Sequence, residues 1–240
     1  MQQLSLPLCF NPGRSFEDFW THPRNAELLH QLKRIGQGES DASLQAGTAL
    51  FVWGNPASGK THLLEALCKF ADRYGYRAAY VDFAEIDMLS TAVLDGLEAL
   101  DLVCLDNLDS LDNDSCYDFQ VAVFRLFNQM KEMSKGLVMT SSKPAHSYKN
   151  TIPDLISRFQ WGLSYQVFGF DQLDSHAFLI WAARRKGMLL PNASADYIVK
   201  HYSRSAHDLL HLLEQLDTIS LREQRKLTIP FIRKIMGAQD

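Results

Sequence analysis

Residues 54–61 of the chain read GNPASGKT, which matches the pattern GxxxxGK[S/T] at every fixed position. A β-type run at 48–53 precedes this segment and an amphipathic helical pattern follows it, which is the context that a phosphate-binding loop requires. Glycine lets the backbone curl so that N–H groups face phosphate oxygens, and the N-terminus of the next helix adds its positive dipole end. The pattern predicts a nucleotide site, and a surface loop that matches by chance is the alternative.

The side chains of this loop have distinct expected roles. Lys60 places a positive charge at the β- and γ-phosphates, and the hydroxyl of Thr61 is a ligand for Mg²⁺. The sequence therefore predicts that ATP or ADP, together with Mg²⁺, is bound by one continuous segment and the histidine that follows it. Its residues are Gly54, Asn55, Pro56, Ala57, Ser58, Gly59, Lys60, Thr61 and His62.

Short β-type runs alternate with longer helical patterns in the first two thirds of the chain, which predicts βαβ units and a mainly parallel sheet. The β-type runs are 48–53, 78–82, 102–105, 137–141 and 163–168, and the helical patterns that follow residue 170 are 175–186, 193–202, 206–221 and 229–236. The predicted fold class is α/β, with a small helical domain at the C-terminus. We expect a flexible arm at 1–14, a nucleotide-binding α/β domain at 15–170 and the helical domain at 171–240.

An acidic residue, Asp106, directly follows the buried β-type run 102–105. Phosphate-loop proteins place the carboxylate that holds Mg²⁺ at this position, so we expect Asp106 to serve the metal together with Thr61. The next residue is Asn107, and an amide cannot accept a proton as a carboxylate does, so we expect weak intrinsic ATP hydrolysis at most. The remaining acids of this region are interpreted as a solvated loop: Asp101, Asp109, Asp112 and Asp114.

Composition restricts the location and the partners of the chain. The net charge is −4, so we expect no strong autonomous binding to DNA. No run reaches the roughly 20 apolar residues that a membrane span needs, and the N-terminus lacks the pattern of a secretion signal. The four cysteines form no CxxC pair, as is typical of a reducing compartment. We expect a cytoplasmic protein that does not bind a membrane.

Several stretches resemble the AAA+ module of the bacterial replication initiator DnaA and its regulatory relatives. They are SFEDFW (15–20), GKTHLL (59–64), LVCLDN (102–107), PDLISRFQWG (153–162) and QRKLTIPF (224–231). The resemblance implies an AAA+ parallel sheet flanked by helices, with the C-terminal helices as a lid domain. AAA+ surfaces often self-associate, which leaves a homodimer open. An initiator continues into a helix-turn-helix domain, whereas this chain ends at Asp240, so we expect DNA to be contacted mainly indirectly.

The arm holds the sequence QLSLPL, which is similar to the peptide with which members of this family bind the β sliding clamp of the replicative DNA polymerase III. Leucines at alternate positions suit an extended peptide with apolar anchors, and the proline reduces the entropy lost on docking. The resemblance implies a clamp-binding site, and an apolar chain end without a partner is the alternative. The residues are Gln3, Leu4, Ser5, Leu6, Pro7 and Leu8.

The resemblance also assigns residues that act on the nucleotide. Arg158 matches the arginine finger that one AAA+ subunit donates to the nucleotide of its neighbour, and a surface arginine paired with Asp154 is the alternative. Where initiators commonly carry an aspartate and a nucleotide-sensing arginine, this chain has Ser142 and His207. A neutral histidine is a poor clamp for a γ-phosphate, so we expect ADP to be bound more readily than ATP.

Together these matches imply an adaptor. The arm would bind the DNA-loaded clamp, the body would dock on ATP-bound DnaA, and Arg158 would complete the hydrolytic site of that partner, which prevents re-initiation of replication. An ATP-driven helicase loader or transposition helper has the same fold, although Asn107 argues against a motor. A small-molecule kinase would need its own acceptor pocket with arginines, and it would leave the QLSLPL segment without a purpose.

Overall fold

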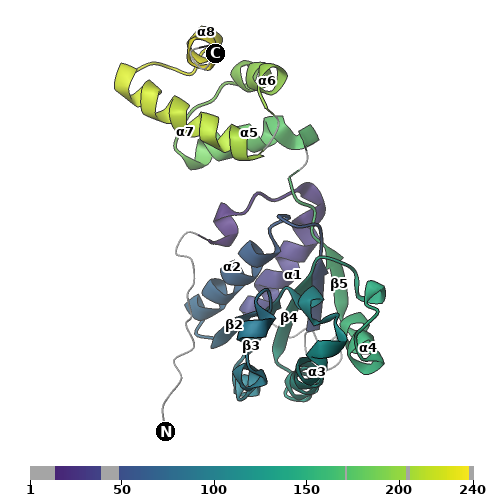
Figure 1. Cartoon of the computed structure of the whole chain (residues 1–240). Helices are drawn as coiled ribbons and strands as arrows, with labels where there is room; N and C mark the ends of the chain where they lie inside the picture. The colour runs from purple at the N-terminus through teal and green to yellow at the C-terminus, as the bar shows by residue number, and fades with distance from the viewer. Residues whose placement is uncertain (1–13, 39–48, 171, 204–205, 238–240) are drawn as a thin grey trace. The chain divides into compact units, whose positions relative to one another are not determined.

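The computed structural model describes residues 14–38, 49–170, 172–203 and 206–237, with the side chains of 206 and 207 excepted. The chain divides into two compact units after Gly169, an α/β unit and a helical unit (Figure 1). No helix in the described ranges is long and apolar enough to cross a membrane.

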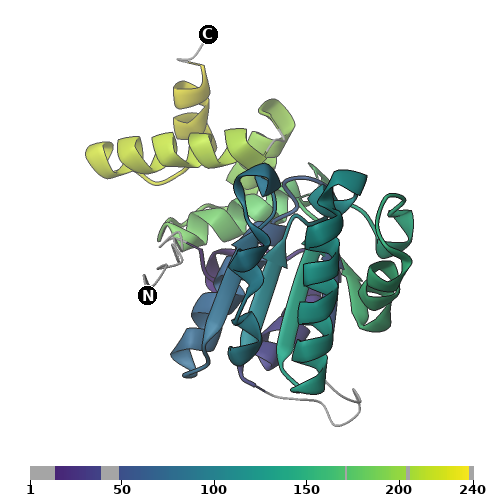
Figure 2. The same ribbon diagram turned by 60° about the horizontal axis from the view of Figure 1, so that its bottom comes forward.

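The α/β unit contains one sheet of five strands, in which all neighbours are parallel (Figure 2). The strand order is β2-β3-β4-β1-β5. Their bounds are β1 (Ala49–Trp53), β2 (Ala78–Asp82), β3 (Leu102–Asp106), β4 (Gly136–Ser141) and β5 (Leu163–Gln166). The predicted α/β class and parallel sheet are confirmed, and the ends of the strands differ from the predicted runs by at most two residues wherever the structure describes them.

Each face of the sheet is covered by helices. Along β1, Leu50 and Val52 pack into one apolar cluster while Phe51 packs into the other, because successive side chains of a strand point to opposite faces. The first cluster includes α1 (Ala26–Gly36) and α2 (Lys60–Arg73), and the second includes α3 (Tyr117–Glu132) and α4 (Pro153–Trp161). The sequence did not predict α1, although its apolar residues recur at helical spacing.

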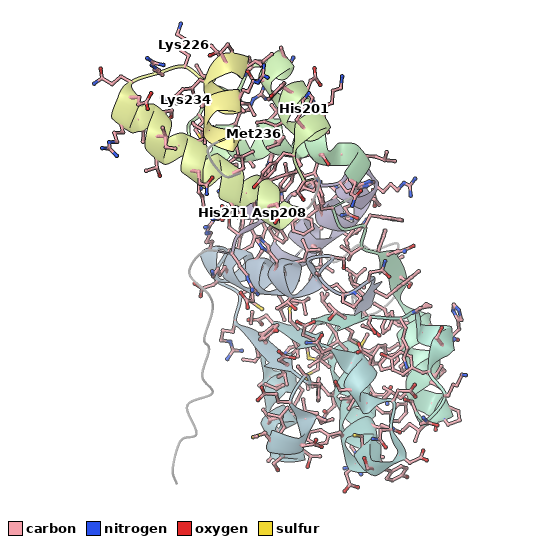
Figure 3. All side chains as sticks on the ribbon, turned by 45° about the horizontal axis from the view of Figure 1, so that its top comes forward. His201, Asp208, His211, Lys226, Lys234 and Met236 are labelled. Atoms are coloured by element: carbon pink, nitrogen blue, oxygen red, sulfur yellow. The ribbon has the colours of Figure 1, made fainter. Side chains whose placement is uncertain are left out.

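The helical unit is made of α5 (Ser175–Arg185), α6 (Asn192–His201), α7 (Ala206–Glu223) and α8 (Ile229–Met236). Its core is formed mainly by leucine, isoleucine and alanine side chains, among them Leu179, Ile198 and Ile232, and it also contains Phe178 and Phe231. Figure 3 labels Lys234 on α8. Its ammonium lies 3.7 Å from the carboxylate of Glu223 at the end of α7. All four helices follow the predicted helical patterns closely, so the small C-terminal helical region is confirmed.

Candidate nucleotide-binding site

The predicted phosphate loop connects β1 to α2 and is shaped by two glycines. Gly59 has φ +97°, and a Cβ there would lie 2.5 Å from Cε2 of Phe19. A Cβ on Gly54 would lie 2.6 Å from the carbonyl oxygen of Val167. Such approaches exclude any larger residue without rearrangement, so both fixed glycines of the motif have a structural cause.

Lys60, the first residue of α2, directs its side chain back into the loop. Its ammonium donates hydrogen bonds to the carbonyl oxygens of Gly54 at 2.8 Å and Asn55 at 3.0 Å, and the residue is only 7% exposed. Burial lowers the pKa of Lys60, while the charges of Asp106 and Asp109 oppose that shift. The loop thus holds a nearly buried cation at the N-terminus of a helix, where a phosphate would be favoured.

A cavity of about 460 Å³ lies against this loop. Its lining residues come from the loop, from the segments that follow β3 and β4, and from the start of the described chain: Arg14, Pro56, Ala57, Gly59, Lys60, Thr61, His62, Asn107, Asp109 and Ser142. The Oγ atom of Ser58 is buried without a hydrogen-bond partner in the described structure. A buried polar atom of this kind suits a loop that receives phosphate oxygens, so the residues present fit a nucleotide.

Asp106 ends β3 and is fully buried. Its carboxylate accepts hydrogen bonds from the Tyr80 hydroxyl at 2.8 Å, from the Asn107 amide N–H at 3.0 Å and from the Thr140 hydroxyl. Burial and the charge of Asp106 together raise the pKa of Tyr80 well above its ordinary value, so Tyr80 stays a donor. Among the described residues, Asp106 is not one that lines the cavity, and its predicted service to Mg²⁺ remains a prediction.

Asn107 adopts a left-handed conformation with φ +58°, which asparagine tolerates better than most residues. Its side-chain amide donates to the carboxylate of Asp82 at 2.7 Å, so the position at which AAA+ ATPases usually carry a second acid holds an amide bonded to the neighbouring strand end. An amide cannot accept a proton as a carboxylate does, and weak intrinsic hydrolysis stays a prediction.

The interpretation of the acids after β3 as a solvated loop was wrong for two of them. Asp109 lines the cavity and accepts a hydrogen bond from the Ser142 N–H at 2.8 Å. The side chain of Asp112 is only 8% exposed and accepts hydrogen bonds from Lys143, from the N–H groups of residues 149 and 150 and from Thr151. Burial would raise the pKa of Asp112, but these donors outweigh it and lower the pKa.

Replacing Asp112 with alanine should lower the free energy of unfolding by about 2–4 kcal/mol, because the change leaves the Lys143 ammonium and two backbone N–H groups without their acceptor. Thermal unfolding of the two proteins measures the difference. Because the folded pKa lies below the ordinary 3.8, the stabilisation is complete above that pH and is lost as the pH falls through the folded value. Asp114→Ala, a change at an exposed position of the same segment, is the control, and an equal loss in both variants would contradict the prediction.

The beginning of the described chain is fastened to α2 beside the phosphate loop. Arg14 forms an ion pair with Glu65, with 3.0 Å between Nη1 and Oε1, and its carbonyl accepts a hydrogen bond from Lys69. The next carbonyl, of Ser15, lies 2.8 Å from Nε2 of His62. By these contacts Arg14, which the sequence analysis placed in the arm, is part of the α/β unit and of the cavity wall.

Residues 14–20 form what we call the N-terminal strap. Two of its aromatic side chains, Phe16 and Phe19, are buried in the same cluster as α1 and α2. The ring of Phe19 lies beside Gly59 and has its centroid 5.5 Å from that of His62. The only sequence signal for this arrangement was the match to SFEDFW, which carries no information about contacts with the loop.

The predicted arginine finger, Arg158, lies on α4, which packs on the face of the sheet opposite α2. Its guanidinium stands over the rings of Phe124 and Phe127 of α3, at 5.5 and 5.9 Å from their centroids. Within the described parts of the chain, Arg158 forms no ion pair with Asp154, so the structure does not support the alternative interpretation. Arg158 is not among the described residues that line the cavity, and its role on a neighbour stays a prediction.

Two predicted sites fall outside the described residues. The clamp-binding residues 3–8 lie before the first described residue, and the side chain of His207 is not described, although its backbone belongs to α7. On the described residues, no group of three histidine, cysteine or acidic side chains could hold a metal by itself. A metal at the phosphate loop would therefore depend on phosphate oxygens as further ligands, as Mg²⁺ commonly does.

Comparisons with known proteins agree with this architecture. A family model of the bacterial DnaA ATPase domain matches residues 10–166, and a model of the Hda lid domain matches residues 171–236. Domain III of the Thermotoga maritima replication initiation protein DnaA has a TM-score of 0.67 and 18% identity, over 95% of this chain and 98% of that one. AMPPCP-bound DnaA from Aquifex aeolicus has a TM-score of 0.69 and 19% identity, over 87% of this chain and 66% of that one.

A more distant likeness is to RuvB of Thermotoga maritima, a Holliday junction branch migration motor, with a TM-score of 0.61 and 12% identity over 94% of this chain and 72% of that one. At such identities the likeness to solved structures is evidence for a shared fold alone, and it does not establish a shared activity. The two family matches meet at residues 166 and 171, on either side of the boundary between the two units.

Proposed function

The chain belongs to the DnaA-related AAA+ family and carries an Hda-type lid domain, and from this membership we propose that it is an adaptor that acts on the initiator DnaA. It would link DnaA to the β sliding clamp and stimulate hydrolysis of DnaA-bound ATP, so that replication does not start again. The observation that carries the proposal is the pair of family matches, which together span nearly the whole chain. The test is an assay of ATP hydrolysis by DnaA in the presence of this protein and clamp-loaded DNA.

The nucleotide that the chain itself binds would be ADP or ATP with Mg²⁺. Support comes from the buried Lys60 ammonium, from the Ser58 hydroxyl without a partner in the described structure, and from the cavity beside Thr61. DnaA structures of the same fold hold AMPPCP. Thr61 would be a ligand of the metal and Asp106 would lie behind it, while His207 in place of an arginine favours ADP over ATP.

Binding of the clamp by residues 3–8 is the part of the proposal that gives the adaptor its location. Tethering to DNA-loaded clamps raises the local concentration of the adaptor near newly replicated DNA without any new contact to DnaA. A complex of the clamp and this chain would thus act mainly on initiator molecules close to active replication.

Replacing Gln3 or Leu4 with alanine should weaken binding to the clamp by roughly 30-fold each, which is typical when an anchor residue of an interface is truncated. Surface plasmon resonance with immobilised clamp measures the change. Gln2→Ala is a matched control, since it removes the same type of side chain one position outside the motif. Nucleotide affinity should stay the same in all three variants, and unchanged clamp binding by the Gln3 and Leu4 variants would refute the tether.

An ATP-driven motor is the rival from another functional class. Motors turn over their own nucleotide, whereas residue 107 of this chain is an amide bonded to Asp82. Steady-state hydrolysis by the isolated chain at about 1 s⁻¹ or faster, within the usual range of enzyme turnover, would favour the motor over the adaptor.

A further inference from the structure

The cavity beside the phosphate loop has one carboxylate in its wall. Among the described residues that line it, Asp109 is the only acid. Asp106, by contrast, is fully buried, and its oxygens are engaged by Tyr80, Thr140 and the backbone of Asn107. Among the described lining residues, Asp109 is therefore the carboxylate that a bound metal and nucleotide would meet.

The fold holds Asp109 in this position from both sides. It lies in a short 3₁₀ helix, Leu108–Leu111, whose two leucines are fully buried and fix the turn against the sheet. The N–H of Ser142, the residue that follows β4, donates to Oδ1 of Asp109 at 2.8 Å, and Ser142 lines the same cavity. Lys60 lines this cavity too, and the charge of Asp109 raises the pKa of Lys60 against the larger lowering by burial.

We propose that Asp109 is a carboxylate that accepts hydrogen bonds from the water shell of the Mg²⁺ that accompanies the nucleotide. This inference rests on the proposed nucleotide binding. Mg²⁺ keeps several waters in protein sites and is held by one or two carboxylates together with phosphate oxygens. Thr61, Lys60 and Asp109 all line the cavity, so a metal–phosphate group there would meet side chains of both charges.

This role has a signature that a purely structural role does not share. Without metal, a carboxylate near the phosphates repels them, so its removal should leave nucleotide affinity unchanged or increase it. With Mg²⁺, the same carboxylate attracts the hydrated cation, so its removal should weaken binding. In a variant without this carboxylate, nucleotide affinity should therefore fall in Mg²⁺ and stay the same or rise in the absence of metal.

The test is titration of the full chain with ADP and with ATP, in Mg²⁺ and in EDTA, for the parent protein and for Asp109→Asn. Asparagine keeps a side-chain oxygen that can accept the Ser142 N–H, so the local fold should persist, which thermal unfolding checks. We expect the Mg²⁺-dependent gain in affinity to fall by about tenfold in Asp109→Asn. Asp114→Asn, which removes the same charge from an exposed position of the same segment, should behave as the parent does.

An equal loss of affinity in Mg²⁺ and in EDTA, or no change in either, would overturn the inference. If the parent protein binds neither nucleotide in Mg²⁺, the proposed nucleotide function fails instead, so the two failures are distinguishable. Asp109→Glu supplies a further check, because a restored carboxylate should recover part of the Mg²⁺-dependent gain.

Discussion

An Arg158→Ala protein should bind nucleotide and the clamp as the parent does, but it should lose almost all stimulation of ATP hydrolysis by DnaA, about 10³-fold or more. An arginine supplied by a neighbouring subunit stabilises the charge that develops in phosphoryl transfer, and removal of such a group has effects of this size. In the structure Arg158 does not line the nucleotide cavity of its own chain, so its loss should leave that cavity intact.

The measurement is single-turnover hydrolysis of labelled ATP bound to DnaA, with clamp-loaded DNA and either protein. Arg158→Lys keeps the charge but loses the planar two-pronged donor, so it should recover only a small part of the stimulation. Arg125→Ala, at an exposed position of the adjacent helix α3, is the matched control for loss of an arginine. Full stimulation by the Arg158→Ala protein would exclude Arg158 as the arginine finger that acts on DnaA-bound ATP.

The second large effect is expected at Lys60. Lys60→Ala should weaken binding of ADP and ATP by roughly 10- to 100-fold, since hydrogen bonds from a charged group to a buried partner are each worth about 1.5–3 kcal/mol. The ammonium is nearly buried and lies at the N-terminus of α2, so no solvent-exposed lysine can replace it.

Calorimetric titration of the variant and of Lys149→Ala, which removes an exposed lysine, measures this effect. Because burial lowers the pKa of Lys60, nucleotide affinity of the parent protein should also decrease as the pH rises towards that lowered value and the ammonium loses its proton. Lys60→Ala should lack this alkaline decrease. Affinity that is equal in the Lys60 and Lys149 variants would show that the loop does not hold the phosphates.

Local sequence patterns predicted the elements of the fold better than their arrangement. The apolar runs of the strands and the spacing of α3 are visible along the chain, because burial on a sheet or helix face has a fixed period. The strand order β2-β3-β4-β1-β5 is set by which strand pairs with which, and no local period carries that information. Helix α1 was missed although Leu28, Leu32 and Ile35 have helical spacing.

The candidate site shows the same limit. The phosphate loop could be predicted because its functional groups are consecutive in the sequence, so that the spacing of the motif alone identifies the binding site. Arg14, Asp109 and Ser142 reach the cavity from three separate segments, so only the tertiary structure brings them together. Asp109 and Asp114 look alike in the sequence. They differ in that Asp109 stands between two buried leucines, which hold it against the end of the sheet.

The N-terminal strap limits how many residues can be deleted from the N-terminus without also disturbing the phosphate loop. Removal of residues 1–13 would take away the proposed clamp-binding segment and spare Arg14, with its ion pair to Glu65. Removal of residues 1–20 would also take away Phe19, whose ring lies against Gly59, and would expose the apolar side of α2. A protein without residues 1–20 would be inactive because its phosphate loop is disturbed, and this inactivity could be mistaken for loss of binding to the clamp.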